Sequence, residues 1–177
     1  MNRNVSKRHH KLHSQLEFRL IAGKEILTVS QNHQILDNIA GRVQEIVDAE
    51  TAVVALAESE GEIVHYAAAV GKHTELILGK RGAAATSGLC GTAFQGYQPV
   101  LVCRTEGDSR VRQDQVKALG IKTALAVPLY FEDRLLGALM ALNRADGELF
   151  DEEAQQDLAS YASEAALLVY QYQTAMK

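Results

Sequence analysis

Two pairs of apolar segments, each joined by a short polar turn, constrain the fold most strongly. Apolar runs of this length, bounded by turn residues, predict β-strands, and connections this short predict antiparallel hairpins. The first pair is "TAVVALA" (51–57) and "EIVHYAAAV" (62–70), joined by "ESEG"; the second is "KTALAVPLYF" (122–131) and "RLLGALMAL" (134–142), joined by Glu132 and Asp133. Because proline has no backbone N–H, we expect the third strand to bulge or bend at Pro128.

Helical periodicity lies on both sides of these hairpins. Apolar residues recur at helical spacing in three segments, and the last segment opens on "DEE", which complements a helix N-terminus. The segments are 12–29, with Leu16, Leu20, Ile21 and Leu27; 35–47, with Ile35, Leu36, Ile39, Val43, Ile46 and Val47; and 151–175, with Leu158, Ala162, Ala165, Val169, Tyr172 and Met176. The last six residues form what we call the C-terminal stripe, and we expect it to exceed what one sheet face buries.

The segment between the hairpins, residues 71–119, has no single hydrophobic period and is rich in glycine. Within it, "PVLVC" (99–103) predicts a short strand and "RVRQDQVKAL" (110–119) a short helix that ends at Gly120. Together these elements predict an α+β fold, with a central antiparallel sheet, the N- and C-terminal helices on one face, and a crossing of loops and short helices on the other.

Length and charge limit the kinds of function to consider. A chain of 177 residues fits one domain, which we place at 31–177, after a basic arm at 1–14 and a helix at 15–30. The net charge of −4 argues against a nucleic-acid binder, although the arm carries Arg3, Lys7, Arg8 and Lys11 without an acid. No segment has the apolar length of a membrane span or a secretory signal. We therefore expect a cytoplasmic protein with free thiols at Cys90 and Cys103.

Four segments, in this order, resemble the GAF domain family. They are "ILDNIAGRVQEIVDAETAVVALAESEGEIVHYAAAVG", "SGLCGTAFQGYQPVLV", "LGIKTALAVPLYFEDRLLGALMALNR" and "FDEEAQQDLASYASEAALLV". The resemblance covers about residues 30–170. It implies a sensor of small ligands or cofactors that works as a dimer through its terminal helices. Fold alone leaves function open.

The resemblance places a ligand pocket between the sheet and residues 71–119. Gly88 and Gly91 permit a close approach of the backbone there. The candidate pocket residues are His65, Leu89, Cys90, Phe94, Val102, Val111 and Leu125. We expect a non-catalytic regulatory module in signal transduction that binds a small ligand of unassigned identity. We also expect it to form a homodimer in which the C-terminal stripe is covered by terminal helices, and to pass its signal to a downstream signalling protein.

An enzyme within the same family is the alternative. Cys90 in "GLCG" resembles the resolving cysteine of the free methionine-R-sulfoxide reductases, which reduce their substrate with thiols. The position of their attacking cysteine falls near Lys117, and their "SE" pair falls on Thr123 and Ala124. A thiol cycle without the attacking cysteine would depend on Cys90 and Cys103 alone. We therefore assign no catalytic residue and place Cys90 in the apolar core.

The sequence also bears on whether the pocket holds a coloured cofactor or a nucleotide. The cysteine and histidine that attach a bilin in related GAF domains fall at about Val111 and Arg112, so a covalent bilin is not expected. Haem, through His65 and a second histidine at 73, is a less favoured alternative, and no metal site is expected. The family's nucleotide-associated motif is matched at Asn143, Arg144 and Phe150 but not at Ala154 and Gln155.

The segment "GKRGAAATSG" (79–88) fits no phosphate-binding motif. It does place Lys80 and Arg81 next to a glycine-rich backbone, an arrangement that would suit an anion. An ordinary surface loop has the same composition. Both interpretations are open at the level of sequence.

Overall fold

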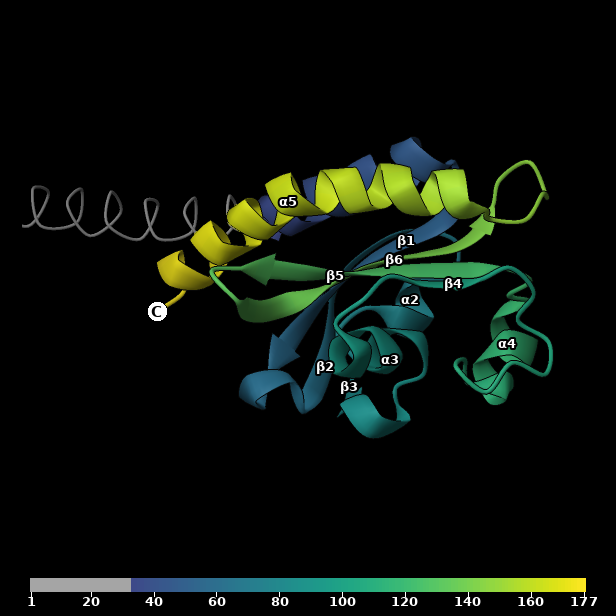
Figure 1. Cartoon of the computed structure of the whole chain (residues 1–177), viewed down its shortest axis with the longest axis horizontal. Coiled ribbons are helices and arrows are strands. Elements are labelled where there is room, and N and C mark those ends of the chain that lie inside the picture. Colours follow the sequence, from purple (N-terminus) through teal and green to yellow (C-terminus); the bar gives the residue numbers. More distant parts are fainter. Residues whose placement is uncertain (1–32) are drawn as a thin grey trace, which may run out of the picture. The chain divides into compact units, whose positions relative to one another are not determined.

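Six strands form one antiparallel sheet in the computed structural model, which describes residues 33–177 (Figure 1). Their order across the sheet is β3-β2-β1-β6-β5-β4, and every neighbouring pair is antiparallel. The strands are β1 (Ala49–Glu58), β2 (Ile63–Gly71), β3 (Arg81–Ala83), β4 (Val100–Val102), β5 (Ala124–Phe131) and β6 (Arg134–Arg144). The predicted arm at 1–14 and helix at 15–30 lie outside the described residues.

Both predicted hairpins are confirmed. Glu132 and Asp133, the two residues between β5 and β6, have φ values of 48° and 58°. Two left-handed residues in succession give the backbone twist that a two-residue hairpin loop requires. The connection from β1 to β2 is a short 3-10 turn, Ser59–Gly61, in which Gly61 has a φ of 91°.

Pro128 lies close to the predicted irregularity of β5. It pairs with Ala138 of β6, and the register of the two strands shifts just beyond it, between Leu129 and Tyr130. On its other side β5 pairs with β4 only as far as Ala126. Pro128 therefore lies where no described strand borders β5 on the β4 side, which is where a missing N–H is tolerated.

One face of the sheet is covered by the helix at residues 33–47 and by α5 (Glu152–Ala175), which lie beside each other in Figure 1. The Asp151 carboxylate accepts a hydrogen bond of 2.9 Å from the Ala154 backbone N–H and so caps α5. Apolar residues of both helices and of the sheet form a single buried cluster. The helices predicted at 35–47 and 151–175 are confirmed, and the one predicted at 110–119 begins only at Gln113.

The C-terminal stripe corrects one prediction. Five of its members are buried in this cluster, against the domain's own sheet and its 33–47 helix; they are Leu158, Ala162, Ala165, Val169 and Tyr172. Met176, at the end, is 51% exposed. Cover in addition to the sheet is therefore present, but it comes from the domain's own 33–47 helix, whereas the expectation assigned it to the terminal helices of a dimer. These five side chains are therefore buried without a second subunit.

The opposite face carries the loops and short helices that were predicted for residues 71–119. The helical pieces are α2 (Thr74–Ile77), the 3-10 turn Ala84–Thr86, α3 (Leu89–Gly96) and α4 (Gln113–Leu119). They bury a second apolar cluster against the sheet. The α+β class and the division of helices and crossing between the two faces are therefore confirmed. None of the helices among residues 33–177 combines the length and apolarity needed to cross a bilayer.

Candidate functional site

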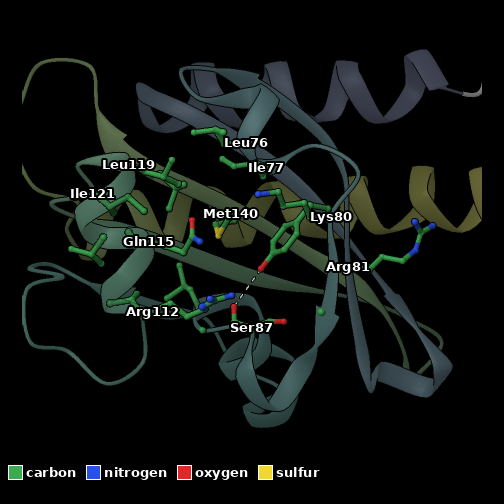
Figure 2. A pocket seen from close by; sticks show the side chains of 18 residues that line it. Leu76, Ile77, Lys80, Arg81, Ser87, Arg112, Gln115, Leu119, Ile121 and Met140 are labelled. Carbon is green, nitrogen blue, oxygen red and sulfur yellow. Dashed lines mark hydrogen bonds between the residues drawn. The ribbon is translucent and has the colours of Figure 1, made fainter.

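A cavity of about 160 Å³ lies between the sheet and the crossing segments (Figure 2). Its floor is made by Ala124 of β5 and by Met140 and Leu142 of β6, and apolar residues from α2, α3, α4 and the loops form much of its wall; these are Leu76, Ile77, Leu89, Val111, Val116, Leu119 and Ile121. Binding sites for drug-sized ligands commonly measure about 300–1,000 Å³. A cavity of this size suits a small metabolite.

Two glycines bring the segments of the wall together. Gly88 has a φ of 63°, and a Cβ at that position would lie 3.2 Å from the backbone nitrogen of Arg112. A Cβ on Gly91 would lie 1.8 Å from the carbonyl oxygen of Ala84. Residues with side chains would push α3 away from the 3-10 turn and from the start of α4. The close approach predicted for these two glycines is therefore observed.

Tyr66 supplies a hydroxyl to the wall. The hydroxyl donates a hydrogen bond of 3.3 Å to the carbonyl oxygen of Ser87, and the Ser87 hydroxyl donates one of 2.7 Å to the carbonyl oxygen of Ala83. Burial raises the pKa of Tyr66 well above its usual range. The phenol therefore stays protonated at neutral pH, and its two lone pairs remain able to accept hydrogen bonds.

Basic residues contribute to the wall, whereas none of the lining residues is an acid. The Arg112 guanidinium lies near Ser87 in Figure 2 and forms an exposed ion pair with Asp114 at 2.6 Å. Arg81 contacts Glu58 at 3.0 Å, and Figure 2 shows its guanidinium directed away from the cavity. Lys80 makes no ion pair with any residue of 33–177, and its ammonium extends toward the middle of the cavity.

Gln115 is the second polar group without a partner. Its amide makes no hydrogen bond within the described part of the chain, and in Figure 2 it extends from α4 toward Met140. Lys80 reaches the same space from the opposite wall. The cavity thus combines an apolar floor with one ammonium and one amide that have hydrogen-bonding capacity to spare.

Comparison with known proteins identifies the family. A family model for the GAF domain matches residues 31–169. The chain belongs to the GAF domain family. None of the curated proteins compared with it matches significantly.

Solved structures of GAF domains share this fold. The GAF domain of a phosphoenolpyruvate-protein phosphotransferase from Acinetobacter has a TM-score of 0.68 and 16% identity, over 82% of this chain and 85% of that one. The second GAF domain of DevS from Mycobacterium smegmatis has a TM-score of 0.64 and 17% identity, over 82% and 99%. Free methionine-R-sulfoxide reductase from Neisseria meningitidis, solved with its substrate, has a TM-score of 0.65 and 19% identity, over 85% and 86%.

The candidate residues predicted from the sequence take three kinds of place in this GAF domain. Leu89 and Val111 line the cavity. A second group lies behind the wall, in the same apolar cluster: Cys90, Phe94 and Val102. Cys90 is fully buried, with its sulfur 3.6 Å from that of Met140, and burial raises the pKa of its thiol to about 12. His65 and Leu125 lie elsewhere.

Leu125 lies on the helical face of the sheet, in the cluster under α5. Successive residues of a strand point to opposite faces. Ala124 therefore faces the cavity and Leu125 faces away from it. Ala124 pairs with Val102 of β4, and cross-strand partners lie on the same face of a sheet. Knowing this pairing would have pointed to Ala124 in place of Leu125.

His65 is separated from the cavity for the same reason. Its neighbour Tyr66 lines the wall, whereas the His65 imidazole Nδ1 lies 2.9 Å from a Glu58 carboxylate oxygen and 3.2 Å from Arg81 Nη2. Burial, and then the charge of Arg81, lower the pKa of His65, although Glu58 opposes them. His73 borders a different, polar cleft with Glu50. Neither imidazole is placed as a haem ligand in this cavity.

Metal binding finds no support in the described residues. Among residues 33–177, no group of three or more histidine, cysteine, aspartate or glutamate side chains is placed to hold a metal ion. Both cysteines are free, Cys90 in the interior and Cys103 on the surface.

The candidates predicted from the sequence omitted several cavity residues, among them Tyr66, Lys80, Gln115 and Met140.

Proposed function

We propose that this GAF domain is a regulatory module that senses a small molecule bound in the cavity and performs no chemistry on it. The observation that carries the proposal is the composition of the wall. It offers an apolar floor and two unpartnered polar groups, Lys80 and Gln115, but no carboxylate, imidazole or thiol. Such a wall suits recognition, because the groups most often used for acid–base or thiol chemistry are missing from its lining and the Tyr66 hydroxyl already donates to the Ser87 carbonyl oxygen.

The enzyme alternative receives no support from the residues at the corresponding positions. The Cys90 thiol is buried and, with a pKa of about 12, is protonated at neutral pH, whereas attack requires the thiolate. Thr123 has a structural role: its hydroxyl donates to the Val102 carbonyl oxygen at 3.2 Å and accepts from the Phe150 N–H at 3.0 Å. The likeness to the Neisseria reductase extends to the fold alone.

We further propose that occupancy of the cavity is reported through the sheet to α5. Alternate residues of β5 serve the two faces: Ala124 and Ala126 belong to the cavity-side cluster, and Leu125 and Val127 to the cluster beneath α5. A shift of β5 on ligand binding would therefore displace the packing of α5. A second copy of the chain or a downstream signalling protein would read that displacement. The free cysteines agree with action in a reducing cytoplasm.

The test fills the cavity. Val116 lines it from α4 and is partly buried, so Val116→Phe should occupy ligand space, while Lys117→Gln on the same helix, outside the wall, serves as the control. We expect native mass spectrometry or a thermal-shift screen of small metabolites to find a ligand for the wild type. At a concentration 100 times its Kd, a ligand stabilises by about 2.7 kcal/mol, which is roughly 5–11 °C in Tm for a chain of this size.

The variant should lose this shift and the control should keep it. A ligand that stabilises Val116→Phe as much as the wild type binds outside the cavity and contradicts the proposal. Turnover of free methionine-R-sulfoxide with thioredoxin, lost in Cys90→Ser, would establish the enzyme alternative instead.

A further inference from the structure

The structure separates two neighbouring cations that the sequence presents as a pair. Lys80 and Arg81 are adjacent, but Arg81 lies in β3 and pairs with Glu58, and it points away from the cavity. Lys80, one residue before the strand, is exposed, has no ion-pair partner among the described residues, and in Figure 2 extends toward the other lining residues. Arg112, the third basic residue of the wall, contacts Asp114 at 2.6 Å. Lys80 is therefore the one basic residue of the wall without a carboxylate partner among the described residues.

We propose that the ligand is a small monocarboxylate with an apolar body. This inference rests on the proposed function and names the class of molecule that the same cavity binds. The carboxylate is held between the Lys80 ammonium and the Gln115 amide, and the body lies on Ala124, Met140 and Leu142. Each group of the ligand thus meets a wall group of matching chemistry.

The charge of the wall sets the charge of the ligand. An anion buried without a partner is strongly disfavoured, so one free ammonium supports one negative charge. A dianion, such as a phosphate monoester, would have to draw Arg112 away from Asp114 to neutralise its second charge. A neutral molecule would leave the ammonium uncompensated, although the exposed Lys80 can turn back to water. A monoanion fits best because it is neutralised by Lys80 alone.

The two unpartnered groups set the shape of the anion. Carboxylate oxygens accept hydrogen bonds, and a charged donor paired with an amide donor on the other side can engage one oxygen each. Gln115 comes from α4 and Lys80 from the segment before β3, so the anion would connect the two sides of the cavity. The apolar floor then favours a compact hydrocarbon group, because removing the apolar surface of that group from water is favourable.

The experiment compares isosteric acids and amides. Benzoate and 3-methylbutanoate are titrated calorimetrically into the wild type beside benzamide and 3-methylbutanamide, with phenyl phosphate as the dianion. We expect at least one carboxylate to bind at least tenfold more tightly than its own amide and than phenyl phosphate. Lys80→Met should weaken carboxylate binding about tenfold, whereas Lys117→Met, the same change on an exposed residue outside the wall, should leave it within twofold.

Several results would overturn the inference. These are binding of the amides equal to that of the acids, tighter binding of phenyl phosphate, equal losses in the two lysine variants, or no binding of either carboxylate. The outcome for the proposed function is separate. If a neutral or dianionic compound is retained in native mass spectrometry and lost in Val116→Phe, the module is still a sensor and only the class of ligand is wrong.

Discussion

Replacing a buried leucine of α5 tests where the C-terminal stripe packs. Leu158 is 0% exposed, and Leu167, on the same helix, is 43% exposed. Leu158→Ala removes three carbons, which at about 0.8 kcal/mol each gives roughly 2.4 kcal/mol, and the cavity left in a close-packed cluster brings the loss to about 3–4 kcal/mol. Leu167→Ala leaves no enclosed cavity and should cost about 1 kcal/mol. The helix-propensity change is the same for both, so the difference reports packing.

Urea unfolding followed by far-ultraviolet circular dichroism measures both variants. With a slope of about 2 kcal/mol/M, Leu158→Ala should lower the midpoint by roughly 1.5–2 M and Leu167→Ala by about 0.5 M. The extra loss in Leu158→Ala should not depend on protein concentration, because the cluster around Leu158 lies within one chain. Equal losses in the two variants would refute the packing of α5 described above. So would a wild-type midpoint that rises with concentration and loses that dependence in Leu158→Ala, since this would place the stripe between subunits.

Two further outcomes follow from the cavity wall. Gly91→Ala should strongly destabilise the domain, because its Cβ would lie 1.8 Å from the Ala84 backbone oxygen. Gly96→Ala should be tolerated, because a Cβ there has nothing within 4 Å. Thermal unfolding of the two variants measures the contrast, and comparable Tm values would contradict it. A thiol reagent at pH 8 should modify Cys103 rapidly and Cys90 only on unfolding, since Cys90 is buried and its pKa is about 12. Rapid modification of both cysteines, measured by mass spectrometry, would show that α3 opens readily.

The sequence was sufficient to locate the strands and helices, but not to tell which face of the sheet each strand residue would lie on. Turn residues and the change of hydrophobic period located both hairpins and α5, since these signals are local. Alternation along a strand says which residues share a face, but it does not say which face meets the crossing segment. This missing information explains why His65 was predicted to line the pocket in place of Tyr66, and Leu125 in place of Ala124. Which element covers a stripe is likewise a long-range property, and the 33–47 helix was not assigned to that place.

The Lys80–Arg81 pair shows how the missing information bears on function. Read as two adjacent cations, the pair would suit an anion, and the sequence does not say of what charge. The carboxylate of Glu58 removes Arg81 from consideration, because the Arg81 guanidinium pairs with it at 3.0 Å and is directed outward. Of the pair, only Lys80 is left beside an apolar floor, and this favours a weakly hydrated monoanion over a strongly hydrated dianion. The preference between benzoate and phenyl phosphate therefore tests whether local sequence or tertiary placement decides the specificity of this cavity.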